Sequence, residues 1–223
     1  MRIRRKKHLK ERLEMVKDYL IVPERDIVNV TEAIKDKKYL IFSDVFNNDN
    51  PIEMEIGCGK GGFIVQKAIK NPNVNYIAVE MLDNIIVMAA EHAKSLGLKN
   101  IIFMNSSAEY LPRYIPDDSI SNLYLNFSPP YPQNGYENRR LTCVRNVKNY
   151  KNFIVNGGKV FQKTDDRPFF EYSFEKFCEC GFEVVEISKD IDDGKIDNVM
   201  TEYEQKFRLQ NIPINALIAT NVK

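Results

Sequence analysis

The order of the predicted elements after residue 50 constrains the fold more than any other feature of the sequence. Short segments with strand character alternate with segments of helical periodicity about 10–15 residues long. The predicted strands are residues 51–57, 75–80, 100–105, 119–127, 159–164, 182–188 and 213–220. This alternation predicts βαβ units, and therefore an α/β fold whose mostly parallel sheet has helices on both faces. No helix is predicted between the last two strands, so these are expected to pair antiparallel.

Local signals set the expected limits of the helices. The predicted helices are residues 9–21, 60–71, 83–97, 138–155 and 167–181, with shorter helical segments at 29–34 and 108–115. Thr31 and Asp83 are expected to cap helix N-termini. Gly97 and the pair Gly157-Gly158 are expected to end helices, and Pro112 is expected to break the segment that contains it.

Positive charge is concentrated in two places although the net charge is only +1. The first twelve residues, MRIRRKKHLKER, hold seven Lys or Arg and one Glu. A second cluster comprises Arg139, Arg140, Arg145, Lys148 and Lys151. Each cluster alone is typical of a solvated surface, but two of them beside a cofactor loop indicate a phosphate backbone as partner. We interpret residues 1–50 as a basic N-terminal arm and residues 51–223 as one domain.

The composition disfavours three classes of protein. No stretch approaches about 18 consecutive apolar residues, so no membrane-spanning helix is expected. The basic N-terminus lacks the apolar segment of a secretory signal, which makes the cytoplasm the expected compartment. The four cysteines form no CxxC pair and only two histidines are present, so no metal site is expected.

A glycine-rich turn follows the first strand of the predicted domain. The segment EIGCGKGGF, residues 55–63, ends that strand and opens a helix, which is where ligands bind in open α/β sheets. Gly57-x-Gly59-x-x-Gly62 matches a dinucleotide-binding turn, whereas Gly57-x-Gly59-x-Gly61 fits the turn of an S-adenosylmethionine site. The glycines alone leave both cofactors open.

Two acidic residues bear on the choice between these cofactors. Glu80 ends the next strand, where its carboxylate can accept hydrogen bonds from both ribose hydroxyls of either cofactor. Glu55 stands directly before the glycines, in a run that otherwise reads as buried. There it would repel a pyrophosphate and attract the methionyl ammonium of S-adenosylmethionine. A dehydrogenase would also usually need a second domain for its substrate, for which the chain is short.

Along nearly the whole chain, the motifs resemble those of the bacterial tRNA (guanine-N7)-methyltransferase family. The likeness rests on MRIRRKK, NPIEMEIGCGKGGFI, NYIAVE, LYLNFS, RRL, GGKVFQKTD and NVMTEYEQKF. The resemblance implies the seven-stranded, Rossmann-like methyltransferase fold with S-adenosylmethionine as the methyl donor. It also implies that the acceptor is N7 of a guanine in the variable loop of tRNA.

The resemblance and the residue chemistry together give a set of candidate site residues. The candidate cofactor-binding residues are Glu55, Gly57, Gly59, Gly61, Glu80 and Ser107, the last standing in a loop where the family usually has an acid. The candidate substrate-binding residues are Tyr131, Gln133, Arg139, Arg140, Asp165, Thr201, Glu202, Tyr203 and Glu204. The candidate catalytic residues are Asn126 and Asp165.

The loop after the fourth strand departs from the family pattern. Pro129, Tyr131 and Gln133 stand where the family usually has Asp, Trp and Lys. Guanine N7 carries a lone pair and no proton, so its methylation needs positioning and no general base. The missing Asp therefore removes no obligatory step, and Asn126 is expected to take part of its orienting role. Tyr131 can either stack on a base or pack within the loop.

The remaining substrate-side residues have specific expected roles and structural alternatives. Asp165 is expected at a strand end, where it can accept from guanine N1–H and N2–H₂. Arg139 and Arg140 are expected to contact phosphates at the start of the next helix. Thr201 and Glu204 also fit a capping box. Two rival functions stay open, a non-catalytic tRNA-binding paralogue and a methyltransferase for another RNA position or a small molecule. Both a monomer and a homodimer are compatible with the sequence.

Overall fold

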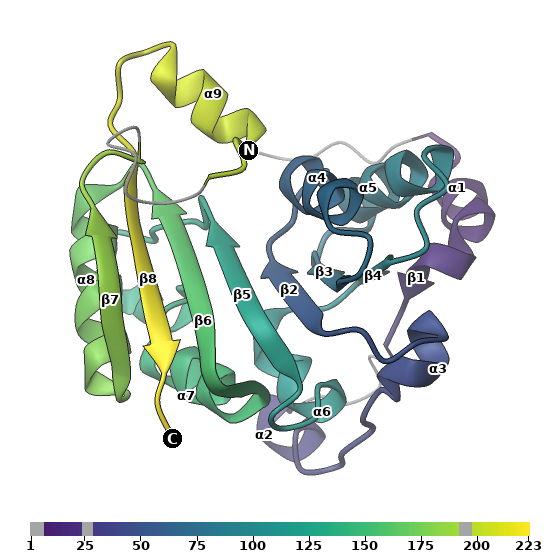
Figure 1. The fold of residues 1–223 in the computed structure, drawn as a ribbon, viewed down its shortest axis with the longest axis horizontal. Coiled ribbons are helices and arrows are strands. Elements are labelled where there is room, and N and C mark those ends of the chain that lie inside the picture. Colours follow the sequence, from purple (N-terminus) through teal and green to yellow (C-terminus); the bar gives the residue numbers. More distant parts are fainter. Residues whose placement is uncertain (1–6, 24–28, 192–197) are drawn as a thin grey trace.

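The structure, a computed structural model, describes residues 7–23, 29–191 and 198–223. Most cations of the first basic cluster, Arg2, Arg4, Arg5 and Lys6, lie outside these residues. The described residues form one eight-stranded sheet in the order β1-β4-β3-β2-β5-β6-β8-β7 (Figure 1). The strands are β1 Leu20–Ile21, β2 Ile52–Ile56, β3 Asn75–Val79, β4 Ile101–Met104, β5 Ile120–Asn126, β6 Ile154–Thr164, β7 Phe182–Ser188 and β8 Asn215–Asn221.

Helices cover both faces of this sheet. The α-helices are α1 Leu9–Met15, α2 Val30–Ala33, α3 Phe42–Phe46, α4 Gly62–Lys70, α5 Asp83–Ser95, α6 Leu111–Tyr114, α7 Val144–Phe153, α8 Arg167–Glu179 and α9 Glu202–Arg208. Short 3₁₀ helices are η1 Lys17–Tyr19, η2 Ala108–Tyr110 and η3 Asn134–Arg139. One apolar cluster packs α7 and α8 against the sheet, and another packs α1, α4 and α5 against it. The predicted α/β fold is therefore confirmed.

The strand order creates a switch point between β2 and β5. From β2 the chain continues to β3 and then β4 on one side, and it then crosses to β5 on the other side of β2. Strands β1 to β6 pair in parallel, so the carboxyl ends of β2 and β5 lie together at one edge. Open α/β sheets bind their ligands at such an edge. β8 runs antiparallel to both β6 and β7, as predicted for the last strands.

The sheet has one strand more than the seven expected. Residues 9–21 were predicted as one helix, but α1 ends at Met15 and Leu20 pairs in parallel with Phe103 of β4. The two residues of β1 pair with backbone groups of β4 that would otherwise be unpaired at the edge of the sheet. Arg12 of α1 also donates two hydrogen bonds, at 2.7 and 2.6 Å, to Glu91 of α5. The described part of the expected arm thus adds a strand to the sheet.

The helix predicted at 138–155 is shorter, and the glycine pair after it has another role. α7 begins at Val144, because residues 134–139 form the 3₁₀ helix η3. β6 already begins at Ile154, so Gly157-Gly158 lies within a strand. The pairing of β6 with β5 is irregular at this point, and a Cβ on Gly158 would lie 2.7 Å from a carbonyl oxygen of β5. The pair therefore forms a bulge and does not end a helix.

Four further local predictions are wrong. Asp83 is the first residue of α5 and not its N-cap, which is Leu82. Asn29, not Thr31, caps α2, since its side chain accepts a hydrogen bond from the backbone N–H of Thr31 at 2.9 Å. Pro112 sits in the first turn of α6, where a missing N–H costs nothing. The helix α9 lies between the last two strands, where none was predicted. Gly97, in contrast, follows α5 with a φ of +65°, as expected of a helix-ending glycine.

Candidate active site

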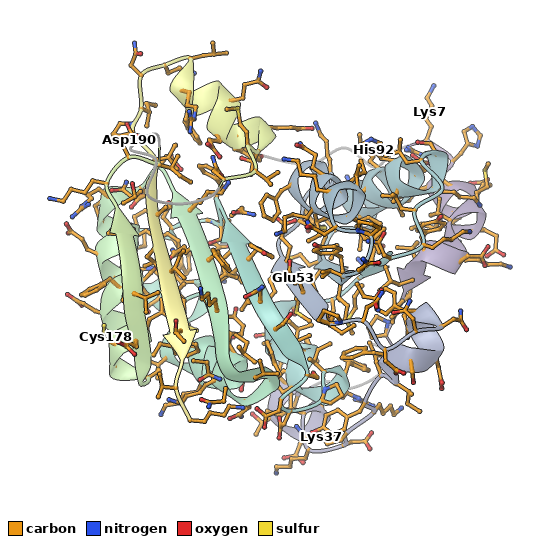
Figure 2. All side chains as sticks on the ribbon, viewed as in Figure 1. Lys7, Lys37, Glu53, His92, Cys178 and Asp190 are labelled. Carbon is orange, nitrogen blue, oxygen red and sulfur yellow. The ribbon has the colours of Figure 1, made fainter. Side chains whose placement is uncertain are left out.

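The carboxyl ends of β2 and β5 hold the first pair of candidate residues. Glu55 on β2 is only 2% exposed. Asn126, the last residue of β5, donates from Nδ2 to Glu55 Oε1 at 2.8 Å. Because successive side chains of a strand alternate between faces, Glu53 lies on the same face as Glu55. Figure 2 marks Glu53 on β2, near the centre of the molecule.

The second carboxylate oxygen of Glu55 has no partner. Oε2 is buried, and none of the described residues donates a hydrogen bond to it. The pKa of Glu55 is raised to about 7, chiefly by burial; the hydrogen bond from Asn126 and the charge of Lys163 oppose this rise, and the charge of Glu80 adds to it. A buried polar atom without a partner is uncommon and calls for a ligand or another specific cause. A cationic ligand group would both pair this oxygen and favour its ionised form.

The glycine turn between β2 and α4 leaves its backbone accessible. Gly57, Gly59 and Gly61 have φ values of +82°, +56° and +81°. A Cβ on Gly61 would lie 2.9 Å from the Cβ of Ala89, so glycine allows the turn to approach α5. A Cβ on Gly59 would meet no atom within 4 Å, so this part of the turn borders open space. The turn can therefore receive a ligand against its backbone.

Glu80 follows β3 and supports this turn. Its Oε2 accepts a hydrogen bond from the backbone N–H of Gly59 at 3.2 Å. Its Oε1 accepts from the backbone N–H of Leu82, at the start of α5, at 3.0 Å. Each carboxylate oxygen has a second lone pair and can accept another donor, such as a ribose hydroxyl. The structure thus brings Glu80 and the glycine turn into direct contact.

The other candidate residues near the sheet lie along the same edge. β4 ends at Met104, shortly before Ser107, and β6 ends at Thr164, directly before Asp165. Along the strand order β4-β3-β2-β5-β6, the strand ends carry, in turn, Ser107, Glu80, Glu55, Asn126 and Asp165. Asp165 is half-buried and makes no hydrogen bond or ion pair with the residues that the structure describes. Its carboxylate is therefore available to a ligand.

Arg140 holds the loop after β5 in a strained conformation. Phe127 and Tyr131 have φ values of +49° and +42°, which non-glycine residues rarely adopt. Nε of Arg140 donates to the Pro130 carbonyl at 2.9 Å, and Nη2 donates to the Tyr131 carbonyl at 3.0 Å. The guanidinium also lies 4.2 Å from the ring centroid of Tyr172. Arg140 thus binds the protein's own backbone.

The neighbouring loop residues are more accessible. Arg139 and Gln133 are exposed, and Tyr131 is half-buried. The guanidinium of Arg139 lies 4.4 Å from the ring centroid of Tyr136. The expectation that the arginine pair begins a helix is wrong, because Arg139 ends η3 and α7 begins at Val144. Of the pair, Arg139 is the better placed for a phosphate.

The two arginines therefore predict different effects on stability. Arg140→Gln is expected to lower the free energy of unfolding by about 2 kcal/mol, because charged hydrogen bonds to two carbonyls are lost. Arg139→Gln, the matched control, is expected to change it by less than about 0.5 kcal/mol. Urea unfolding of both variants measures the difference. Equal losses in the two variants would contradict the loop-holding role.

The helix α9 lies over the carboxyl ends of β5 and β6 (Figure 1). Thr201 is its N-cap and accepts a hydrogen bond from the backbone N–H of Glu204 at 3.0 Å. Glu204 is fully buried, and its carboxylate binds Lys163 Nζ at 3.0 Å and Arg208 Nη2 at 2.7 Å. The side chain of Glu204 is therefore occupied inside the protein.

The outer face of α9 contacts both halves of the site. Glu202 Oε2 lies 3.6 Å from Nζ of Lys60 in the glycine turn. Tyr203 is 60% exposed, and its ring stacks on Phe127 with centroids 6.2 Å apart. The helix thus joins the turn after β2 to the loop after β5.

Sequence reasoning missed Lys163 and Glu53. Lys163 lies in β6 and ties α9 to the sheet, while Glu53 accepts hydrogen bonds from Asn122 Nδ2 at 2.7 Å and Tyr124 OH at 2.9 Å. In the sequence, the signal available for both was that each is a charged residue within a predicted strand. Period-2 patterns mark such residues as buried on one face but do not identify their partners.

The arrangement fits an organic cofactor with a cationic group and hydroxyls. Glu55 offers an unpartnered carboxylate oxygen, Glu80 offers acceptors, and Gly59 borders open space. Within the described residues, no group of three or more His, Cys, Asp or Glu is arranged to hold a metal ion. No helix in that part of the chain has the length and apolar character needed to cross a membrane.

Solved structures share this fold at low sequence identity. The 16S rRNA methyltransferase KamB superposes with a TM-score of 0.64 at 12% identity, over 84% of this chain and 96% of that chain. Phosphoethanolamine N-methyltransferase 2 of Haemonchus contortus, solved in complex with S-adenosyl-L-methionine, superposes with a TM-score of 0.52 at 14% identity. That alignment covers 86% of this chain and 53% of the other. These similarities establish the fold alone.

Sequence comparisons identify the family. A family model described as "Putative methyltransferase" matches residues 49–217. A tRNA (guanine-N(7)-)-methyltransferase of Oceanobacillus iheyensis is 42% identical over 174 residues, which are 78% of this chain and 82% of the relative. The enzyme of the same name from Clostridium perfringens is 35% identical over 98% of this chain and 99% of the relative. The chain therefore belongs to the tRNA (guanine-N(7)-)-methyltransferase family.

Proposed function

We propose that the protein transfers a methyl group from S-adenosylmethionine to N7 of a guanine in tRNA. The observation that carries this proposal is the buried, unpartnered Oε2 of Glu55 beside an accessible glycine turn. This oxygen can receive the ammonium of the donor. The edge of the sheet next to it, at β5 and β6, carries amide and carboxylate groups suited to a purine. The names of the relatives support tRNA as the substrate and guanine N7 as the acceptor atom. We place that guanine in the variable loop, as the resemblance of the sequence motifs implies.

The chain's own residues divide the work of holding the donor, which supplies an electrophilic methyl group on a sulfonium. Glu55 binds the ammonium, and Glu80 accepts hydrogen bonds from the ribose hydroxyls. The backbone of Gly57, Gly59 and Gly61 lies against the donor. Ser107, in the loop that follows β4, contributes a neutral hydroxyl at the far end of the site. Two acids and a polar turn thereby select a cationic donor over a dinucleotide.

The acceptor side positions a nucleophile that needs no deprotonation. Guanine N7 has a free lone pair, so the protein only has to hold the base in line with the methyl group. Asp165 accepts hydrogen bonds from guanine N1–H and N2–H₂, which fixes the orientation of the base. Asn126 keeps Glu55 in place and completes this edge. Orientation and proximity account for the acceleration in this scheme.

The loop after β5 and the helix α9 bind the RNA around the base. Tyr203, exposed on α9, offers a ring on which a base can stack, and Tyr131 offers a second one. Arg139 and Gln133, both exposed, contact the backbone of the RNA. The other candidate residues of this region act through α9. Thr201 caps the helix, Glu202 contacts Lys60, and Glu204 anchors the helix inside the protein. We place the enzyme in the cytoplasm, where tRNA is processed.

A methyl-transfer assay with nucleoside mapping tests this proposal. Unmodified tRNA is incubated with the protein and S-adenosylmethionine, digested to nucleosides and analysed by mass spectrometry. The expected product is 7-methylguanosine, and its loss is expected when the variable-loop guanine is replaced by adenine. Another methylated nucleoside would favour a different RNA position. Binding of tRNA without binding of the donor at millimolar concentration would favour the non-catalytic paralogue.

A further inference from the structure

Lys163 is a buried cation in β6 whose hydrogen bonds are all made inside the protein. Its side chain is 7% exposed. Nζ donates to Asn198 Oδ1 at 2.9 Å, to the Val199 carbonyl at 3.0 Å and to Glu204 Oε2 at 3.0 Å. Two of these acceptors lie in the segment that leads into α9 and the third, Glu204, lies in α9 itself, so Lys163 anchors that helix to the sheet. An ammonium has three donors, and all three are used here.

The register of the sheet also places Lys163 next to the donor side of the site. Lys163 is the direct partner of Asn126 in the pairing of β6 with β5, and Asn126 donates to Glu55. Directly paired residues of neighbouring strands project on the same face. In agreement, Nζ of Lys163 lies 5.2 Å from the ring centroid of Phe63, which packs against Tyr124 at 5.0 Å. The ammonium and the Glu55 carboxylate therefore share one low-dielectric face.

We propose that Lys163 is a positioning residue of the donor site, because its ammonium keeps the Glu55 side chain in the carboxylate form that receives the donor. This inference rests on the proposed use of S-adenosylmethionine. A carboxylate buried without a cation takes up a proton, and a neutral acid binds an ammonium poorly. Burial lowers the pKa of Lys163, and the carboxylate of Glu204 opposes this by stabilising the charged ammonium. The anchor of α9 thus serves the donor site as well.

The other groups around Glu55 do not supply this positive charge. The pKa of Glu55 is raised to about 7, chiefly by burial, and among its neighbours Asn126 and Lys163 oppose this rise whereas Glu80 adds to it. Burial also raises the pKa of the Cys58 thiol and of the Tyr124 phenol, so both remain uncharged near neutral pH. Asn126 is a neutral amide. Within this set, Lys163 is the cation that acts on Glu55.

Direct titration of Glu55 tests the first half of the proposal. The Cδ signal of Glu55 is followed by carbon-13 NMR in the donor-free protein from about pH 5 to pH 9, and Glu55→Gln identifies it. Lys163→Met is expected to raise the titration midpoint by at least about one pH unit. The double variant Lys163→Met/Glu204→Gln also removes the buried charge that the single variant leaves behind, which protects the fold. The same upward shift is expected in the double variant.

Calorimetric titration of S-adenosylmethionine tests the second half. At pH 7, a midpoint raised by one unit lowers the ionised fraction of Glu55, and hence donor affinity, about fivefold. This loss is expected in both the single and the double variant. An unchanged midpoint, or recovery of the wild-type midpoint in the double variant, would overturn the proposal, since Lys163 would then act through α9. A shifted midpoint with unchanged affinity would also overturn it. Failure of the wild-type protein to bind the donor would overturn the proposed function as well.

Discussion

Glu55→Gln is expected to weaken S-adenosylmethionine binding by at least about 30-fold while making the donor-free protein more stable at pH 8. The affinity loss follows from removing one member of a buried charge pair, which costs about 2–5 kcal/mol. The lower end of this range corresponds to about 30-fold at 25 °C, and its middle to more than 100-fold. Calorimetric titration with the donor at pH 8 measures this effect.

The gain in stability follows from the burial of Glu55 in the donor-free protein. Burial raises its pKa to about 7 from the ordinary value of 4.5. Such a group stabilises the fold fully below pH 4.5, and this contribution is lost as the pH rises through 7. A shift of this size corresponds to at most about 3 kcal/mol. Glutamine carries no charge to be buried, so the variant is expected to exceed the wild type at pH 8 and to match it near pH 5.

Urea unfolding at pH 5 and at pH 8 checks this prediction, with Glu80→Gln as the matched control. Glu80 is half-buried and contacts the same glycine turn. Glu80→Gln is therefore expected to weaken donor binding without a pH-dependent gain in stability. A stability difference between Glu55→Gln and wild type that is the same at both pH values would contradict the assigned cause.

Asp165→Ala is expected to lower turnover on tRNA by about 100-fold, with donor affinity unchanged within about twofold. Asp165 has no partner among the described residues and follows β6, on the acceptor side of the switch point. Its loss would leave the guanine edge without acceptors and the base poorly oriented, and misplacement of this kind costs about 100-fold. Single-turnover kinetics with saturating tRNA, together with donor calorimetry, separate the two effects.

The adjacent Asp166 provides the matched control for this prediction. Its side chain caps α8, since Oδ1 accepts a hydrogen bond from the backbone N–H of Phe169 at 2.7 Å. Asp166→Ala is expected to lower stability by about 1 kcal/mol and to leave turnover of the folded enzyme near the wild-type level. A loss of donor affinity in Asp165→Ala, or equal turnover losses in both variants, would refute the acceptor-side role.

Local patterns predicted the parts of the fold that depend on neighbouring residues in the chain. The run IEMEI has the period of a strand, and β2 is found at Ile52–Ile56. The position of that strand also led to the prediction that the glycines and Glu55 lie at a ligand site, because ligands bind at the edge where parallel strands end. Gly97 ended α5 as expected because a left-handed residue satisfies the last carbonyls of a helix.

The features that the sequence did not predict depend on contacts between distant residues. Glu204 and Lys163 are 41 positions apart, and neither a glutamate nor a lysine in the sequence predicts a buried ion pair. Arg140 resembles a phosphate ligand in the sequence, but two carbonyls of the preceding loop bind it. The extra strand at Leu20–Ile21 likewise depends on the open edge of β4. Contacts with residues elsewhere in the chain determine each of these three features.

A crystal structure of the protein with S-adenosylmethionine would show whether Glu55 receives the ammonium of the donor. We predict that the donor lies against the glycine turn, with its ammonium within hydrogen-bond distance of Glu55 Oε2 and its ribose hydroxyls on Glu80. We also predict that the methyl group faces the edge formed by Asn126 and Asp165. A donor whose ammonium binds elsewhere, or a turn left empty at saturating donor, would refute the assignment of Glu55 and the glycine turn as the donor site.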